Sequence, residues 1–319
     1  MMTQNFYFQR WITNGFIILS LMFLMFVPVR AQNANRTVNI TDQTNLAAIR
    51  TLINDAIVAV NNLGGGTVTV TGVHVCTAPI SEPVNIPSGV TVLWKADLSS
   101  DVPANYVLCL SGEGVFEVTD EGIETGTSVR IANFALSAMY VQRAIFVEAG
   151  STVTVKVSGG TVSTLHKGIA ISSGANVEVS GGTVSAGGNT SSAISGRTNI
   201  TISGTGRVEA QATAINTSGT ITVNGGTIIG SFAVQNSLTV AQNVTLTIPQ
   251  EYTLAVREKA TVNNYGTIVN NGTIANSGII VNNGTITNNK VINIDNGKIV
   301  GGNVLAGEHN IYLNINYSF

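Results

Sequence analysis

Apolar residues follow a helical spacing in one stretch of the chain, near its N-terminus. Residues 42–62 place apolar side chains at the three- and four-residue spacing that is typical of an amphipathic helix. We expect Asp42 or Thr44 to cap the start of this helix and Gly64-Gly65-Gly66 to end it. Its expected buried face consists of Leu46, Ile49, Ile53, Ala56, Ile57 and Val60.

After this helix, apolar and polar residues alternate in short runs that are separated by glycine, asparagine and serine. The first run is Thr67-Val68-Thr69-Val70, which has the two-residue period of a strand. One helix followed by many strands indicates a cap over the first coil of a strand stack. Without a cap, the open end of such a stack exposes its core and its unpaired edge.

The strand-rich part is internally repetitive. The segment Val157-Ser158-Gly159-Gly160-Thr161-Val162 returns at 179–184, loosely at 202–208, and again at 223–228. Gly160 and Gly226 are three repeats apart, which gives a mean step of about 22 residues. A second apolar element recurs between these copies, at 144–145, 169–171, 193–194, 214–215 and 233–234. Such units predict stacked coils whose strands find backbone partners above and below at about 4.8 Å.

The period shortens to six residues after Val262. The pattern Asn-Gly-Thr-Ile-x-Asn occurs in full at 271–276 and 283–288, and three such hexads would close a triangular coil of eighteen residues. We expect the isoleucines to point inward and Asn-Gly to lie at corners that use a positive φ. Stacked asparagines would form amide ladders, either as turn chemistry or as a polar face for a ligand. The hexad isoleucines are Ile268, Ile274, Ile280, Ile286 and Ile292.

These patterns predict an all-β fold, a parallel β-helix (solenoid) with an N-terminal capping helix and a hexapeptide-period C-terminal section. The expected division is 1–31 signal peptide, 32–66 N-terminal cap, 67–248 coils of about 22 residues, 249–310 hexapeptide section and 311–319 terminal strand.

Residues 1–31 have the build of a secretory signal. Arg10 precedes the largely apolar run 16–27, and Val29-Arg30-Ala31 offers small residues for cleavage after Ala31. We therefore expect a secreted protein on the outer surface or in the periplasm, with an uncleaved anchor as the alternative. No later stretch has the length and hydropathy of a transmembrane helix.

Charge argues against nucleic acid as a partner. Removal of Arg10 and Arg30 leaves 13 basic against 17 acidic residues, a net charge of about −4. Cys76 and Cys109 would enter an oxidising compartment, where they either pair as a disulfide or remain as buried thiols.

Two segments carry a family resemblance. The cap helix running into Gly64–Val70, followed by Pro83-Val84-Asn85-Ile86-Pro87-Ser88-Gly89-Val90-Thr91-Val92, resembles the opening of the pectate-lyase-like right-handed parallel β-helix repeat superfamily. The resemblance implies an extracellular glycan context, shared by polysaccharide lyases, glycoside hydrolases and adhesins. Polygalacturonase-like enzymes of this superfamily carry paired aspartates, a Gly-His-Gly motif and an Arg-x-Lys motif. This chain has no Asp-Asp pair and no histidine between glycines, and its Arg257-Glu258-Lys259 occurs without the other two motifs. It therefore looks like a non-catalytic, surface or adhesin-like member.

The densest acidic group is a candidate calcium site. Five carboxylates within twelve residues could supply the oxygen ligands that a hard cation needs, or they could simply be a solvated turn. These residues are Glu113, Glu117, Asp120, Glu121 and Glu124. We predict no other cofactor.

Basic and aromatic residues give two further candidates. Arg130, Arg143 and Lys156 could form a basic groove with the acidic turn, or they could be isolated surface charges. The aromatic residues could provide a platform for sugar rings, although burial in the core is the simpler interpretation. The aromatic residues in question are Trp94, Tyr106, Tyr140 and Phe146.

We therefore predict a secreted or cell-surface, non-enzymatic β-helix protein that serves as an adhesive or glycan-contacting scaffold. Its expected partner is an extracellular polysaccharide or a host or cell-surface glycan. The alternative is a polysaccharide lyase or glycoside hydrolase that uses the coils between about 90 and 210, where most acids and bases lie. A purely structural stalk is a third hypothesis. No catalytic residue is predicted.

Overall fold

The computed structural model describes residues 34–76, 82–101, 105–123, 127–134, 142–301, 303–306 and 311–314. The predicted signal peptide, residues 1–31, lies outside these ranges, as does most of the predicted terminal strand. The division into domains therefore stays a prediction.

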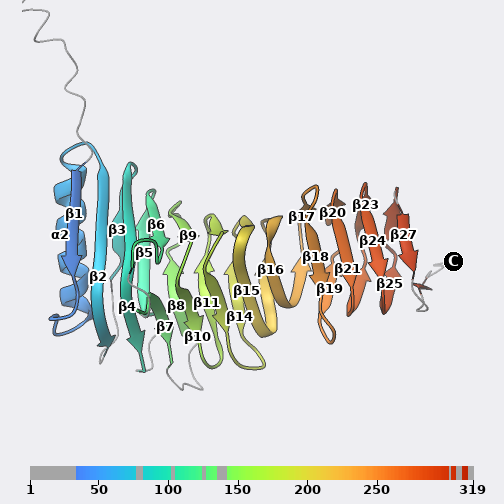
Figure 1. Ribbon diagram of the computed structural model, residues 1–319, viewed down its shortest axis with the longest axis horizontal. Coiled ribbons are helices and arrows are strands. Elements are labelled where there is room, and N and C mark those ends of the chain that lie inside the picture. Colours follow the sequence, from blue (N-terminus) through green and yellow to red (C-terminus); the bar gives the residue numbers. More distant parts are fainter. Residues whose placement is uncertain are drawn as a thin grey trace, which may run out of the picture.

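The described chain contains one helix and many short strands (Figure 1). In chain order, the elements up to residue 196 are β1 (Ala34–Asn39), α2 (Leu46–Asn61), β2 (Gly66–Cys76), β3 (Val84–Ile86), β4 (Val90–Ser100), β5 (Leu108–Gly112), β6 (Val115–Val118), β7 (Arg130–Asn133), β8 (Gln142–Val147), β9 (Thr154–Val157), β10 (Thr161–Thr164), β11 (Gly168–Ser173), β12 (Val177–Val179), β13 (Thr183–Ala186) and β14 (Ser192–Gly196).

Two long strands then lead into the C-terminal section. The remaining elements are β15 (Ile200–Thr217), β16 (Thr220–Val234), β17 (Ser237–Val240), β18 (Thr245–Ile248), β19 (Thr253–Val256), β20 (Thr261–Asn264), β21 (Thr267–Asn270), β22 (Thr273–Asn276), β23 (Ile279–Asn282), β24 (Thr285–Asn288), β25 (Val291–Asp295), β26 (Lys298–Val300), β27 (Asn303–Ala306) and β28 (Ile311–Asn314).

The strands stack along the long axis of the molecule in three faces, which successive strands visit in turn. The first face holds β6, β9 and β12, the second face holds β7, β10 and β13, and the third face holds β8, β11 and β14. Farther along, the same order continues with β17, β18 and β19 and with every later group of three. Each described strand pairing is parallel, as the repeats predict.

Long strands join the faces. Within β15, Ile200–Ile202 pair with β12, Arg207–Ala210 with β13, and Thr213–Thr217 with β14. The backbone ladder therefore bends around corners and wraps around the long axis as one sheet, whereas β18, β21, β24 and β27 form a separate four-stranded sheet. The coarse prediction is confirmed: the fold is all-β and parallel after one N-terminal helix. The arrangement is consistent with a β-helix-like solenoid.

The coil shortens toward the C-terminus. Val162 pairs with Val184 and Thr245 with Thr267, so these coils have the length that the longer repeat predicts. Thr261 pairs with Ile279, which is the step that three hexads imply. The shorter coils continue the stack directly, because β17 pairs with both β16 and β20.

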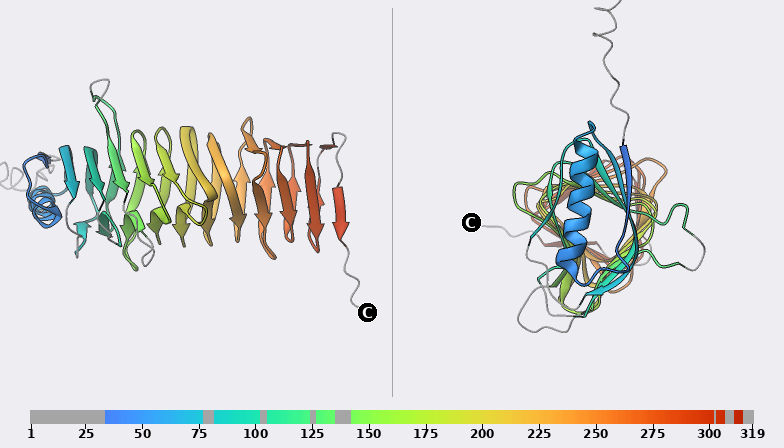
Figure 2. Two further views of the ribbon diagram at one scale, coloured as in Figure 1. Left: turned by 90° about the horizontal axis from the view of Figure 1, so that it is seen from below. Right: turned by 90° about the vertical axis from the view of Figure 1, so that its left-hand side faces the viewer.

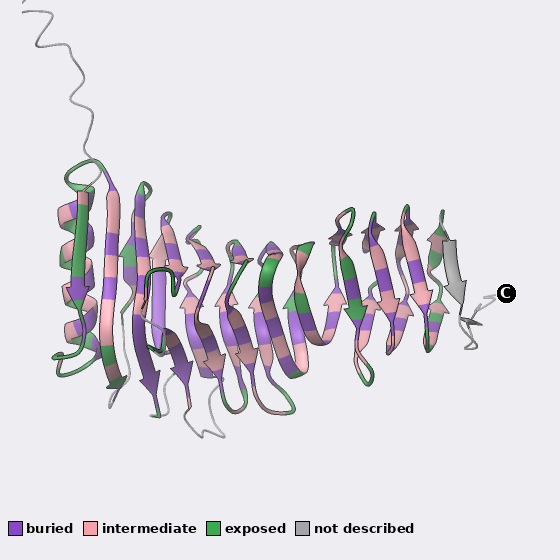
Figure 3. Cartoon of the chain, in the orientation of Figure 1, coloured by how far each residue is buried: buried purple, intermediate pink, exposed green. Residues whose placement is uncertain are grey.

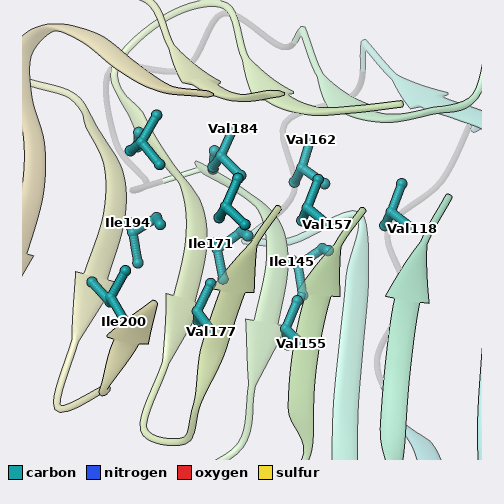
Figure 4. Close-up of a cluster of buried hydrophobic side chains, with 14 of the residues drawn as sticks. Val118, Ile145, Val155, Val157, Val162, Ile171, Val177, Val184, Ile194 and Ile200 are labelled. Carbon is teal, nitrogen blue, oxygen red and sulfur yellow. The ribbon is translucent and has the colours of Figure 1, made fainter. Parts of the chain in front are cut away.

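The core lies between the three faces and consists of aliphatic ladders. Figure 4 shows Val155 beside Val177 and Ile145 beside Ile171, each from a neighbouring coil. Burial alternates along strands such as β9, β10 and β20 (Figure 3), and all five hexad isoleucines are fully buried, as predicted. Stacking like on like removes apolar surface from water in every coil.

Helix α2 lies across the N-terminal end of the stack (Figure 2). It buries Leu46, Ile49, Ile53, Ile57 and Val60, while Ala56 is partly buried. The predicted cap residue was wrong. Asn45 is the N-cap, and its side-chain oxygen accepts a hydrogen bond from the Ala48 N–H at 2.9 Å, whereas Asp42 and Thr44 precede the cap.

The hexad corners also correct the prediction. Gly266, Gly272, Gly278 and Gly284 do not have a positive φ. Instead, a Cβ at Gly266 would lie 2.3 Å from the Val244 carbonyl oxygen, so the close approach of stacked coils selects glycine there.

The asparagines that end the hexad strands are fully buried and form part of the predicted ladders. Asn264 donates to Asn282, and Asn270 donates to Asn288, each at 2.7 Å. Because these side chains point into the corners, they are not available as a polar face for a ligand.

The two cysteines are buried free thiols rather than a disulfide. Cys76 ends β2 and Cys109 lies in β5, two strands that do not pair with each other.

Candidate functional site

A groove of about 380 Å³ runs along the second face. Two rows of residues form its two sides, each row draws one residue from each of several consecutive coils, and Thr164, Ala186 and Ala210 lie between the rows. The groove is therefore a product of the stacking and extends along the long axis of the molecule.

The first row lies on the strands themselves. In β10 and β13 every second side chain points inward, so Ser163 and Ser185 point outward. Ser163 is in register with Ser185, Ser185 with Glu209, and Glu209 with Ile229. Small serine side chains on two coils leave room above the sheet.

The second row follows the strand ends. Leu165 donates its N–H to the Asn133 carbonyl, and Gly187 donates to the Thr164 carbonyl, at 3.0 and 2.8 Å. A Cβ at Gly187 would lie 2.2 Å from the Leu165 carbonyl oxygen, so only glycine fits there. The missing side chain leaves the groove open at this coil.

Aromatic residues stand at the two ends of the groove. Phe134 follows β7 directly, and Tyr252 lies in the turn between β18 and β19. Gln211 lies between them, and its Oε1 accepts a hydrogen bond from the Gly188 N–H at 3.1 Å, which orients the amide.

The charges in and beside the groove are paired. Glu209 accepts a hydrogen bond from Arg207 Nε at 2.7 Å. Arg130 Nε donates to Asp97 at 3.0 Å, and its guanidinium lies 5.0 Å from the centre of the Phe134 ring. Glu209 is the single carboxylate among the described residues that line the groove. The lining therefore offers hydroxyl, amide and aromatic groups rather than a strong net charge.

The predicted acidic cluster lies elsewhere and does not converge. Glu117 on β6 accepts a hydrogen bond from Ser158 Oγ at 2.5 Å, and the backbone carbonyl of Glu121 accepts one from Lys95. Glu113 and Asp120 are exposed, and Glu124 lies outside the described residues. Within the described ranges, no three His, Cys, Asp or Glu side chains come together as a metal site. The calcium site stays a prediction.

The three candidate bases are on three different faces. Arg130 is on β7, Arg143 on β8 and Lys156 on β9, where Lys156 pairs with Glu178 at 3.1 Å. Burial lowers the pKa of Arg143, whose guanidinium lies 5.1 Å from the Phe146 ring centre. Only Arg130 approaches the groove, so the structure does not form the basic groove that the sequence suggested.

The four aromatic residues of the predicted platform do not share one surface, because Trp94 lies in the core. Trp94 is fully buried, donates Nε1–H to the Ala96 carbonyl at 2.9 Å and packs 5.8 Å from Phe116. Tyr106 stacks on Phe146, with the two ring centres 5.6 Å apart, and neither residue lines the groove. Tyr140 lies outside the described residues.

Sequence reasoning missed Phe134 and Tyr252. Each lies shortly after a strand, Phe134 after β7 and Tyr252 after β18, but only the strand pairing shows that both positions line one groove.

The chain matches no protein-family model, no curated protein and no solved structure. In the part of the chain that the structure describes, no helix has the length and apolar character needed to cross a membrane.

Proposed function

We propose that this chain is a secreted or cell-surface parallel β-helix of the pectate-lyase-like kind, and that it serves as a non-enzymatic scaffold that contacts glycans through the second-face groove. The observation that carries this proposal is the groove itself, an elongated site with aromatic ends and a hydroxyl and amide floor. In ligand sites of this kind, apolar and aromatic side chains contact the ligand, and a few polar groups of the protein fix its orientation.

The regular stacking supports a scaffold role. From β7 to β16 the second-face segments pair coil by coil, so the ladder holds the groove lining in fixed positions from Phe134 to Ile229. Tyr252 directly precedes β19, which pairs with β16. Side chains on strands and tight corners lose little conformational entropy when a ligand binds, so little of the binding free energy is lost to ordering them.

The arrangement of charge supports binding without catalysis. Glycosidases of the common type use two carboxyl groups about 5–10 Å apart. Among the described lining residues, the groove has Glu209 alone, and Arg207 already holds its carboxylate. A lyase would need a base beside the substrate, and two of the three candidate bases lie on other faces.

A polysaccharide hydrolase or lyase is the second candidate, because Glu209 lines the groove. If Glu209 acts as a general acid or base, Glu209→Gln would abolish product release and leave glycan binding intact. Under the scaffold proposal, the unaltered protein releases no product in the first place.

The leader-like N-terminus supports export, and the net charge of about −4 after its removal disfavours nucleic acid as the partner. Extracellular polysaccharides and cell-surface glycans are therefore the proposed partners.

A glycan array with the mature protein, residues 32–319, tests the proposal. We expect binding to a subset of polysaccharides, with no increase in reducing ends and no absorbance from unsaturated sugars when calcium is present. Product formation would favour the enzyme. Absence of binding to every glycan would favour a structural stalk.

A further inference from the structure

The groove repeats along its length with the period of the coils. Leu165, Gly187 and Gln211 occupy the same place on three consecutive coils, as do Ser163, Ser185 and Glu209. Stacked strands lie about 4.8 Å apart. A pyranose unit in an extended polysaccharide has a similar length, so each coil presents its lining to about one sugar unit.

The ends of the groove set the length of ligand that fits. From the coil of Phe134 the register passes through Thr164, Ala186 and Ala210, and then through β16 to the turn that holds Tyr252. These five coil steps correspond to roughly 24 Å at the strand spacing. A chain of about five or six sugar units would reach from one aromatic ring to the other.

The chemistry changes from the ends to the middle. Phe134 and exposed Leu165 form one apolar end, and Ile229 and Tyr252 form the other. The middle carries the Ser185 hydroxyl and the Gln211 amide. Sugar rings present an apolar C–H face that stacks on aromatic rings and hydroxyls that need hydrogen-bond partners.

The charges select against an acidic polysaccharide. The charged group in the floor is the carboxylate of Glu209, which is paired with Arg207, so the lining gives a uronic acid chain no attractive positive charge. The two neighbouring arginines are already paired, Arg207 with Glu209 and Arg130 with Asp97, so neither is free to bind the carboxylates of an acidic chain.

Resting on the proposed function, we infer that the groove binds a linear, uncharged polysaccharide laid along the stack with about one sugar unit to each coil, between Phe134 and Tyr252. The substrate class and the length dependence are the new elements, and both can fail while glycan binding itself is confirmed.

Calorimetric titration with oligosaccharides of defined length tests both elements. The probes are linear cello-, xylo-, manno- and chito-oligosaccharides of two to eight units, with oligogalacturonates of the same lengths. We expect the affinity for at least one uncharged series to rise up to about five or six units and then to level off. Oligogalacturonates should bind at least tenfold more weakly than the best uncharged series.

A blocking variant assigns the binding to this groove. Ser185→Trp fills the floor, and Thr183→Trp is its control, because Thr183 points outward from the same strand but does not line the groove. Ser185→Trp should abolish binding, while Thr183→Trp should bind normally and melt at a similar temperature. A second pair, Tyr252→Ala and the exposed Tyr265→Ala, keeps the test decisive if the tryptophan variant does not fold.

Tyr252→Ala should weaken binding of the six-unit ligand about tenfold and that of the three-unit ligand much less, and Tyr265→Ala should change neither. Preference for oligogalacturonates, affinity that is independent of length, or equal effects of the paired variants would overturn the inference while leaving glycan binding in place. If no polysaccharide binds at all, the proposed function fails and the inference falls with it.

Discussion

Buried asparagines hold the corners of the short coils together. Asn270 Nδ2 donates to Asn288 at 2.7 Å and to the Val291 carbonyl at 2.8 Å, and its Oδ1 accepts from the Gly272 N–H at 3.2 Å. Asn289 makes a similar side-chain bond to Asn271 at 2.8 Å, but on the exposed surface.

Asn270→Ala should therefore destabilise the protein by about 3 kcal/mol, because it leaves several buried polar groups without partners. Asn289→Ala should change the free energy of unfolding by less than about 0.5 kcal/mol. Denaturant unfolding followed by circular dichroism measures both. Equal losses of unfolding free energy in the two variants would show that the buried amide ladder stabilises the protein no more than the exposed one.

The buried thiols make stability depend on alkaline pH. Burial, together with Asp101 near Cys76 and Glu148 near Cys109, raises the pKa of each thiol from 9.0 to about 12. In the unfolded chain the thiols ionise near their ordinary pKa, so the free energy of the unfolded state falls relative to that of the folded state as the pH rises from about 9 to 12.

The folded protein should keep this contribution below pH 9 and lose it as the pH approaches 12. In the variant with both Cys76→Ala and Cys109→Ala, stability should decline less steeply over this range. Some slope should remain, because the pKa of Tyr106 is also raised by burial. Unfolding midpoints between pH 8 and 11 measure the difference, and parallel curves for the two proteins would contradict the assignment.

At the scale of single elements, the start of helix α2 shows what sequence periodicity leaves open. Residues 41–45 offer several side chains that cap helices well, and the apolar period locates a helix start only to within a few residues. In the structure, Asn45 accepts from the Ala48 N–H.

Asn45→Ala should cost about 1 kcal/mol of stability, the usual value for loss of an N-cap side chain. Asp42→Ala should have almost no effect, because Asp42 lies outside the helix. Thermal denaturation of the two variants compares them directly. A larger loss for Asp42→Ala would mean that the helix begins earlier than Leu46.

The strands themselves were largely predictable, and the groove was not. A strict six-residue spacing identifies Ile268 and Ile280 as core residues because strand side chains alternate between inside and outside. The hexad glycines were predicted correctly as corners but for the wrong reason, since the distance between coils is a tertiary property. Phe134 and Tyr252 line the same groove only through the register of several coils, which no local pattern specifies.

At the scale of the whole molecule, stacked coils that contact only their neighbours should tolerate removal of one complete coil. Deleting residues 266–283, which make up one short coil, joins Tyr265 to Gly284. Strand β24 then takes the place of β21, because Thr267 pairs with Thr285 in the intact protein. Ile286 would lie inside, over Leu246, so the aliphatic ladder would continue without interruption.

Deleting residues 267–283, which spares Gly266, is the matched control. It shifts the following chain by a single position, and in a strand this turns every inward side chain outward. We expect the whole-coil deletion to keep a cooperative melt and slow hydrogen exchange in β24. The control deletion should exchange rapidly throughout the chain that follows the junction. Hydrogen–deuterium exchange followed by mass spectrometry distinguishes the two, and if both deletions exchange alike, the stacked-coil architecture does not govern stability at this end.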